Sequence, residues 1–268
     1  MDKSIKIASV QMHVSNDNEK NLQTMEDCLK HIDNLFKDVD LVVFPELCSM
    51  SLDQTMEKQA EEIPGIISNL FSKWAKKYNK WLIPGSFYEK HTNKIYNSAP
   101  VFSPSGKLLG VYRKRYPWSP YEKTSPGQTP FTFKIKGVGT IGLMICYDMW
   151  FPEVARDLTN LGAEVIIVPT MTTTGDRLHE QIISQSIAIT HQCYLISCNG
   201  VGLGGVGGSQ IVDPEGMILQ RNSEGPVIQT AIIDFDHVKK IREKGIAGIT
   251  NPHKAFKKNK QYFKVYNK

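Results

Sequence analysis

The sequence comprises 268 residues, of which 41% are hydrophobic and 22% charged, with 20 Gly and 14 Pro. This profile is typical of a globular protein and excludes collagen-like, coiled-coil and intrinsically disordered chains. No apolar run reaches the roughly 18 residues of a membrane span, and the first residues contain no apolar signal core. The five Cys are scattered and form no CxxC pair. We therefore expect no disulfide framework, no zinc ribbon, no membrane partner and a cytoplasmic location.

The net charge of +5 is unevenly distributed along the chain. Residues 251–268 carry six Lys and no acid, which leaves the preceding residues with a net charge of −1. These preceding residues show no basic stripe with interleaved aromatics, so we expect no nucleic-acid partner. The aromatic side chains of this basic arm are expected to dock on a partner subunit; they are Phe256, Tyr262, Phe263 and Tyr266.

The first half of the chain alternates strand and helix patterns. We expect strands at Ile5–Gln11, Asp40–Phe44, Trp81–Tyr88, Tyr96–Phe102 and Lys107–Tyr112, and helices at Asn18–Phe36 and Gly65–Tyr78. One face of the first helix is apolar, and Asp17 can cap its N-terminus. A Pro-rich loop is expected from Arg113 to Pro130.

The second half continues the same alternation. We expect strands at Val138–Cys146, Glu164–Val168, Tyr194–Cys198 and Val227–Phe235, helices at Glu153–Leu161 and Arg177–His191, and a hairpin of Gln210–Asp213 with Met217–Gln220. Alternating strands and helices with hairpins among them predict an α/β layered fold with mixed sheets.

Neither cofactor nor metal binding is expected. The segments Gly137–Gly142 and Gly202–Gly207 match GxGxxG. A dinucleotide-binding fingerprint must open a helix, but each of these segments leads into a strand. The seven His form no ligand set such as HExxH, and we interpret His179–Glu180 as a solvated pair on a helix.

Polar residues follow three apolar strands. Cys146 stands where a strand ends, Glu46 follows LVVFP, and Arg113–Arg115 follows LLGVY. Because strand ends converge on one edge in a layered α/β fold, these groups are expected to meet there. A carboxylate could then take the thiol proton while a lysine stabilises the developing negative charge.

These segments resemble the nitrilase superfamily of carbon–nitrogen hydrolases. The likeness rests on FPE at 44–46, YRK at 112–114 and CYDMWFPE at 146–153, and it extends in order and spacing to about Phe235. The resemblance implies a four-layer α-β-β-α sandwich that pairs with a second subunit, as a homodimer or a higher homo-oligomer. We expect one hydrolase domain over residues 1–250 and the basic arm over 251–268.

The resemblance also assigns roles. Glu46 becomes the general base, Lys114 the cation that stabilises the tetrahedral intermediate, and Cys146 the nucleophile. The segment YPWSPYEKTSPG at 116–127 is similar to aliphatic amidases and formamidases, and it makes Glu122 the second glutamate of the site. The backbone N–H of Tyr147 is the second expected oxyanion donor. The two flanking arginines are interpreted as solvated charges.

Specificity is less clearly indicated. Many relatives that cleave amides of dicarboxylic acids have an arginine where this chain has Trp150, so a substrate carboxylate is not expected there. Trp150 resembles the N-carbamoylputrescine amidase pattern and could hold a cationic amine, or it could lie in the core. Trp118 is a second candidate for the pocket wall.

The first functional hypothesis is a cofactor-independent amidase that converts a small amide to a carboxylic acid and ammonia through a cysteine thioester. The alternative is hydrolysis of an N-carbamoyl amine by the same residues. A nitrilase is less favoured because Tyr147 replaces the tryptophan of the nitrilase Cys-Trp-Glu pattern. A catalytically silent interaction module is the hypothesis from another class.

Overall fold

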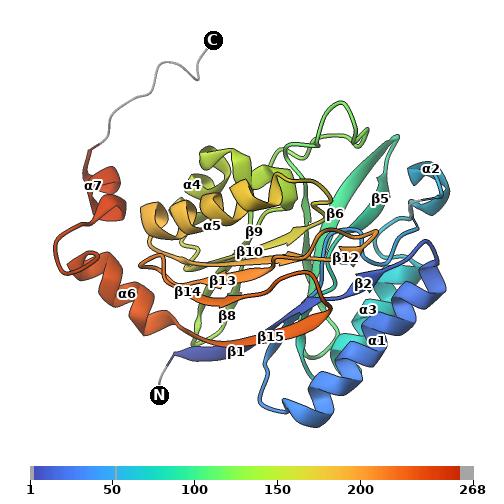
Figure 1. Ribbon diagram of the computed structural model, residues 1–268, viewed down its shortest axis with the longest axis horizontal. Coiled ribbons are helices and arrows are strands. Elements are labelled where there is room, and N and C mark those ends of the chain that lie inside the picture. Colours follow the sequence, from blue (N-terminus) through green and yellow to red (C-terminus); the bar gives the residue numbers. More distant parts are fainter. Residues whose placement is uncertain (1–2, 52, 260–268) are drawn as a thin grey trace.

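Two β-sheets face each other in the computed structural model, which describes residues 3–51 and 53–259 (Figure 1). The first sheet has the order β15 (Val227–Asp234), β1 (Ser4–Gln11), β3 (Leu41–Val43), β4 (Trp81–Ile83), β6 (Lys94–Phe102) and β5 (Phe87–His91), with β7 (Leu108–Arg113) also pairing with β6. The second has the order β14 (Ile218–Arg221), β13 (Gln210–Val212), β11 (Tyr194–Asn199), β10 (Val165–Thr170), β9 (Gly139–Leu143) and β8 (Phe131–Ile135). A short ladder joins β12 (Val201–Gly202) to β2 (His13–Val14).

Helices cover the outer face of each sheet (Figure 1). On the first sheet lie α1 (Asn18–Leu35) and α3 (Ile66–Lys77), and on the second lie α4 (Pro152–Asn160) and α5 (Arg177–His191). The remaining helices are α2 (Met56–Gln59), α6 (Phe235–Lys244) and α7 (Pro252–Lys258). Within the described ranges, no helix combines the length and apolar character needed to cross a membrane. The predicted α-β-β-α sandwich with mixed sheets is confirmed.

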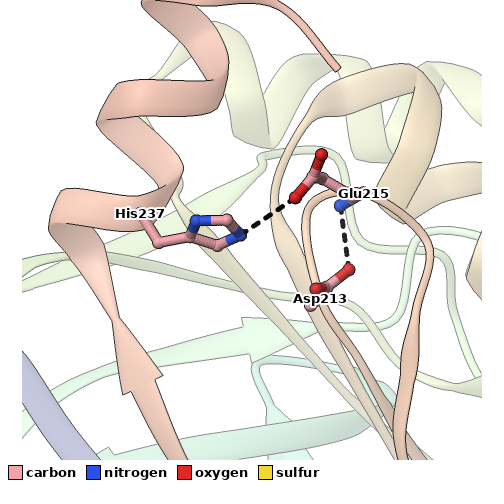
Figure 2. A group of neighbouring side chains, drawn as sticks. All are labelled: Asp213, Glu215 and His237. Carbon is pink, nitrogen blue, oxygen red and sulfur yellow. Dashed lines mark hydrogen bonds and ion pairs between the residues drawn. The ribbon is translucent and has the colours of Figure 1, made fainter. Parts of the chain in front are cut away.

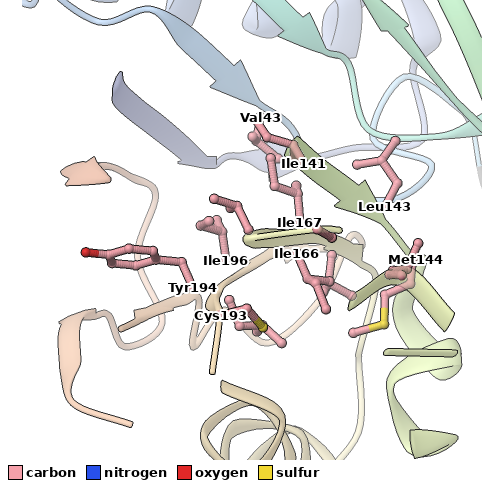
Figure 3. Packing of buried hydrophobic residues seen from close by; sticks show 14 of the residues in the cluster. Val43, Ile141, Leu143, Met144, Ile166, Ile167, Cys193, Tyr194 and Ile196 are labelled. Atoms are coloured by element: carbon pink, nitrogen blue, oxygen red, sulfur yellow. The ribbon is translucent and has the colours of Figure 1, made fainter. Parts of the chain in front are cut away.

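The apolar strand β3 shows how the layers are held together. Leu41 and Val43 belong to the core between the two sheets, while Val42 and Phe44 belong to the core beneath α1 and α3. This division follows from the two-residue period of a strand, which sends successive side chains to opposite faces. Figure 3 shows Val43 beside Ile141 of the second sheet. Each such fully buried side chain contributes about 1.5–3 kcal/mol.

Helix α1 forms as its pattern predicts. Asp17 accepts a hydrogen bond from the backbone N–H of Lys20 at 3.1 Å, so it caps the helix. Met25, Leu29 and Ile32 are buried against the first sheet. The helix ends at Leu35, one residue before the expected end.

Some expected elements differ from those observed. The single strand expected at 81–88 is split into β4 and β5, because Gly85 turns the chain with φ of +77°. A Cβ at Gly85 would lie 1.8 Å from the carbonyl oxygen of Pro45, so the turn requires glycine. Strand β8 and helix α6 were not expected. The two GxGxxG segments lead into β9 and β13, as expected.

The basic arm begins as a helix of its own chain. Helix α7 contacts α5 and α6, and the guanidinium of Arg156 lies 4.2 Å from the ring centroid of Phe256. Tyr262, Phe263 and Tyr266 lie outside the described residues. Docking of the arm on a partner subunit therefore stays a prediction.

Candidate active site

Polar side chains that follow four strands line one cavity of about 200 Å³. Glu46 and Lys114 come after β3 and β7 of the first sheet, and Cys146 and Thr172 come after β9 and β10 of the second. The N–H of Glu46 donates to the carbonyl of Thr170 at 3.3 Å, which joins the two sheets at this edge. The convergence expected from the strand ends therefore occurs.

Lys114 lies between two carboxylates. Its Nζ donates to Oε1 of Glu46 at 2.8 Å and to Oε2 of Glu122 at 2.6 Å. Lys114 and Glu46 are 2% and 3% exposed, and the Glu122 side chain is 13% exposed. Removing one partner of such a buried pair strongly destabilises the folded protein, because the remaining charge is left buried and uncompensated.

Glu122 is held in place although it comes from a loop. Its oxygens accept hydrogen bonds from the N–H of Trp118, the hydroxyl of Thr124 and Nδ2 of Asn97. The same Nδ2 donates to Glu46 at 2.8 Å, so Asn97 bridges the two carboxylates. Asn97 was missed by sequence reasoning because it lies within an ordinary strand pattern of β6. The one local signal was that Asn97 is a polar residue shortly before the apolar end of this strand, Ala99–Phe102.

The arginines beside Lys114 are not solvated charges, so that expectation was wrong. Arg113 donates twice to the buried carboxylate of Glu89, at 2.6 and 2.7 Å. Arg115 pairs with Asp157 at 2.7 Å. Both arginines thus anchor the ends of the segment that carries Lys114.

Cys146 occupies a strained backbone position. The strand expected to reach it ends at Leu143, and Cys146 begins the 3₁₀ helix η1 (Cys146–Trp150). Its φ is 45°, in the left-handed region that side chains rarely adopt, at a cost on the order of 1–3 kcal/mol. The first N–H groups of a helix have no acceptor within it, so the N–H of Tyr147 can bind an oxyanion beside the thiol.

Asp148 connects the turn of Cys146 to the segment of Lys114. Its fully buried carboxylate accepts hydrogen bonds from four donors: the Tyr112 hydroxyl at 2.7 Å and the N–H groups of Tyr116 at 2.8 Å, Ile145 at 2.9 Å and Arg115 at 3.1 Å. Burial raises the pKa of Asp148 to about 6, although the donors oppose the rise. Asp148 was not among the site residues predicted from the sequence.

Glu180 is buried, so the interpretation of His179–Glu180 as a solvated pair was wrong for the glutamate. The carboxylate of Glu180 is 3% exposed and lines the cavity. It accepts the hydroxyl of Thr172 at 2.6 Å and the guanidinium of Arg177 at 3.0 Å. The helical period alone does not distinguish this buried carboxylate from an exposed one.

The ionisable groups perturb one another. Burial raises the pKa of Glu46, and the nearby Glu122 adds to this, while the ammonium of Lys114 opposes it. Burial alone would lower the pKa of Lys114, but Glu46, Cys146 and Glu122 outweigh it and hold the pKa well above its usual range. Burial also works against ionised Glu122, yet Lys114 keeps its pKa below the usual value. Lys114 therefore remains a cation and Glu122 an anion.

The thiol of Cys146 is neutral at rest. Burial raises its pKa well above the ordinary value, and Glu46 and Glu180 contribute in the same direction, while Lys114 opposes them. Attack on a substrate therefore requires a base to remove the proton. Glu46, whose pKa is raised by burial, is the carboxylate of the cavity best suited to accept that proton.

The three residues proposed for substrate contact all line the cavity: Trp118, Tyr147 and Trp150. Trp150 is 37% exposed and its Nε1 lies 3.4 Å from Oε1 of Glu180, so it belongs to the cavity wall and not to the core. Trp118 contacts Tyr121, with ring centroids 4.5 Å apart.

A separate group could offer metal ligands: Asp213, Glu215 and His237 (Figure 2). Nε2 of His237 lies 3.7 Å from Glu215, and Asp213 accepts the N–H of Glu215 at 2.9 Å. Since Val212 pairs with Leu195 near the start of β11, this group lies at the opposite end of the second sheet from Thr170 and the cavity. It takes no part in the chemistry described above.

Comparisons with known proteins identify the family of this chain. The sequence model of the carbon–nitrogen hydrolase family matches residues 6–243. The omega-amidase NIT3 of Saccharomyces cerevisiae is 31% identical over 269 aligned residues, which cover 91% of this chain and 91% of the relative. The deaminated glutathione amidase of Bos taurus is 28% identical over 261 residues, covering 88% of this chain and 79% of the relative.

Solved structures give the same result. The crystal structure of Saccharomyces cerevisiae Nit3, described as a member of branch 10 of the nitrilase superfamily, has a TM-score of 0.83 and 31% identity, covering 90% of this chain and 94% of that one. The carbon–nitrogen hydrolase of Helicobacter pylori has a TM-score of 0.79 and 27% identity, covering 99% and 97%. The two-sheet sandwich is thus that of the nitrilase superfamily, which confirms the resemblance. The chain belongs to the carbon–nitrogen hydrolase family.

Proposed function

We propose that this protein hydrolyses the C–N bond of a small amide to a carboxylic acid and ammonia, through a thioester on Cys146. The observation that carries the proposal is the meeting of Cys146, Lys114, Glu46 and Glu122 in one cavity. A nucleophile, a base within the same site and a fixed cation are the three components that acyl transfer from an amide requires.

Acylation begins when Glu46 takes the thiol proton as Sγ of Cys146 attacks the amide carbon. The carbonyl electrons move to oxygen, where Lys114 and the N–H of Tyr147 stabilise the negative charge. When the intermediate collapses, the C–N bond breaks and Glu46 returns its proton to the leaving nitrogen. Ammonia departs and the acyl group remains on sulfur.

Deacylation repeats these steps with water. Glu46 removes a proton from the water that attacks the thioester, and a second tetrahedral intermediate forms with its oxyanion on Lys114. Cleavage of the C–S bond releases the carboxylic acid and restores the thiol with the proton held by Glu46. Glu122 keeps Lys114 charged and oriented, and it can accept a hydrogen bond from the substrate amide.

An N-carbamoyl amine is the second candidate substrate. Trp150 is in the cavity wall, and Asp176 and Glu180 also line the cavity. An indole face and carboxylates favour a cationic amine, and they disfavour a substrate that carries a carboxylate.

Ammonia release by the purified protein tests the proposal. The panel contains formamide, acetamide, propionamide, glutaramate, N-carbamoylputrescine and a simple nitrile. We expect turnover of the short neutral amides and the weakest turnover of glutaramate among the amides. Activity confined to N-carbamoylputrescine would support the second candidate, and activity confined to the nitrile would contradict both.

We further propose that two copies of the chain associate through α5 and the turn before β14. Leu178, Ile182 and Ile189 are exposed along one face of α5, and Met217 and Ile218 are exposed beside them. A Cβ at Gly216 would contact Ile189, so the turn and the helix form one surface. Contiguous exposed apolar surface of this kind is typical of an interface.

The single domain of residues 1–250, the docking of the arm 251–268 on the partner subunit and a cytoplasmic location belong to the same proposal. The five free cysteines support a reducing compartment.

A further inference from the structure

Cys146 has a polar neighbour just after strand β10 that the proposed mechanism does not use. Sγ of Cys146 lies 3.9 Å from Oγ1 of Thr172. The backbone of Thr172 is fixed by Asn199, whose Oδ1 accepts its N–H at 2.9 Å and whose Nδ2 donates to its carbonyl at 3.1 Å. Thr172 is therefore a rigid contact for the nucleophile.

The direction of the hydrogen bond between Thr172 and Cys146 can be deduced. The hydroxyl of Thr172 lies 2.6 Å from Oε2 of Glu180. An ionised carboxylate only accepts, so the single hydroxyl hydrogen of Thr172 points to Glu180. Toward Cys146 the threonine oxygen can then act only as an acceptor, so in any hydrogen bond between the two groups the thiol is the donor.

Arg177 and Glu180 form a buried ion pair. The guanidinium of Arg177, which is 4% exposed, donates to Glu180 at 3.0 Å. Its other N–H groups are also satisfied, by the carbonyls of Gly207 and Gly208 and by the hydroxyls of Ser197 and Thr170. An arginine is always charged in proteins, so Glu180 is paired with a fixed positive charge.

The charged groups around the thiol come from the ends of strands in the first sheet and from helix α5, which covers the second sheet. Glu46 and Lys114 approach from the first sheet, with Glu122 behind Lys114. Glu180 approaches from α5, with Arg177 behind it. After burial, the negative charges of Glu46 and Glu180 raise the pKa of Cys146, and Lys114 acts against them.

We propose that Thr172 and Glu180 are positioning residues that orient the thiol of Cys146 and keep it protonated until a substrate is bound. This inference rests on the proposed amidase function. A thiolate formed in the empty site would face the lone pairs of Thr172 and the charge of Glu180, which disfavour it. When the substrate carbonyl is present, the proton passes to Glu46 and the negative charge moves at once to the carbonyl oxygen near Lys114.

The first test is alkylation by iodoacetamide, followed at Cys146 by peptide mass spectrometry from pH 6 to 10. Glu180→Gln removes the negative charge near the thiol and keeps an amide oxygen that can accept from the Thr172 hydroxyl. We expect the midpoint of the alkylation profile to fall by about one pH unit and the rate at pH 7.5 to rise at least about threefold. Structural damage would also raise the alkylation of the fully buried Cys193 and Cys198, so these two thiols should stay as unreactive as in wild type. An unchanged midpoint or a slower reaction would overturn the proposal.

The second test leaves the buried Glu180–Arg177 pair intact. Thr172→Val removes the hydroxyl, while Thr172→Ser keeps it. We expect kcat for the best amide to fall about tenfold or more in the valine variant with KM changed less than about threefold, and to be retained in the serine variant. Thr159→Val, which removes another buried threonine hydroxyl bonded to backbone carbonyls, is the matched control and should behave like wild type. Equal kcat in Thr172→Val and wild type would overturn the inference.

The alkylation profile requires no turnover. A protein that hydrolyses none of the amides but shows the predicted shift in Glu180→Gln would contradict the proposed function and support the positioning pair. Amide turnover with no shift would have the opposite meaning.

Discussion

Lys114 is the residue on which most of the proposed chemistry depends. It is the one cation among the described residues that line the cavity, and it contacts both Glu46 and Glu122. Lys114→Ala should lower kcat/KM for the best amide by about 10³-fold or more, because it removes the charge that stabilises the oxyanion. Arg115→Ala is the matched control and should retain turnover within about tenfold. The reverse order of these losses would show that Arg115 and not Lys114 is the catalytic cation.

Asp148 makes a residue-scale prediction about stability. Its carboxylate accepts four hydrogen bonds, and Asn in its place would turn an amide N–H₂ group toward some of these donors. Asp148→Asn should lower the free energy of unfolding by about 2–4 kcal/mol, measured by urea denaturation at pH 7. Asp157→Asn, which removes a more exposed partner of Arg115, should cost less than about 1 kcal/mol. Equal stability of Asp148→Asn and wild type would contradict the connecting role of Asp148.

At the scale of elements, helix α5 serves the cavity with one face and presents apolar side chains on another. Arg177 and Glu180 are buried, while Leu178 and Ile182 are 68% and 66% exposed. Ile182→Glu should convert the proposed dimer to a monomer in light scattering, because a charge in an apolar interface is costly. Lys73→Glu, on the exposed face of α3, is the control and should leave the dimer intact. A wild-type protein that is monomeric at all concentrations would contradict this assignment of the surface.

Elements with a clear period were predictable from sequence. Helix α1 and strand β3 have an uninterrupted pattern and a defined end, and both lie where expected. Strand β8 has the alternating sequence FTFKI of a half-buried strand, but it is short and directly follows a long polar loop, so it was missed. Helix α6 was missed because its mean composition is strongly charged, although Asp234 caps it through two N–H groups.

The candidate site was predictable only in part for a physical reason. Glu46, Lys114 and Cys146 each follow an apolar strand, so local sequence indicates that they leave the sheet. Glu180 and Asn97 lie inside regular elements, where nothing local indicates burial. Their role arises from tertiary contacts that bring α5 and β6 to the same cavity.

At the scale of the whole molecule, buried histidines link stability to pH. Burial lowers the pKa of His191 to about 4, and the charges of Arg156 and Arg242 contribute. Burial also lowers the pKa of His253 on α7 to about 3. In the unfolded chain a histidine titrates near 6.5, so between about pH 6.5 and 4 the unfolded chain binds a proton that the folded chain does not. Stability is therefore full above pH 6.5 and falls as the pH decreases.

His191→Gln tests this linkage. Between pH 7.5 and 5.0 the free energy of unfolding should decrease by about 2 kcal/mol less in this variant than in wild type, measured by urea denaturation. Asp148, whose raised pKa gives the opposite slope at acid pH, is present in both proteins and cancels in the comparison. His31→Gln, on the exposed side of α1, should lose as much stability as wild type. The same loss in His191→Gln as in wild type would contradict the account.

The central claim is that Cys146 forms the acyl-enzyme. It is tested most directly by ammonia release from the best short amide, measured side by side for wild type, Cys146→Ala and Cys198→Ala. Cys198 is fully buried in the core between the sheets, so its loss controls for removal of a thiol. We predict turnover by wild type and Cys198→Ala, and no turnover above background by Cys146→Ala. Ammonia release by Cys146→Ala at the wild-type rate would contradict the thioester mechanism.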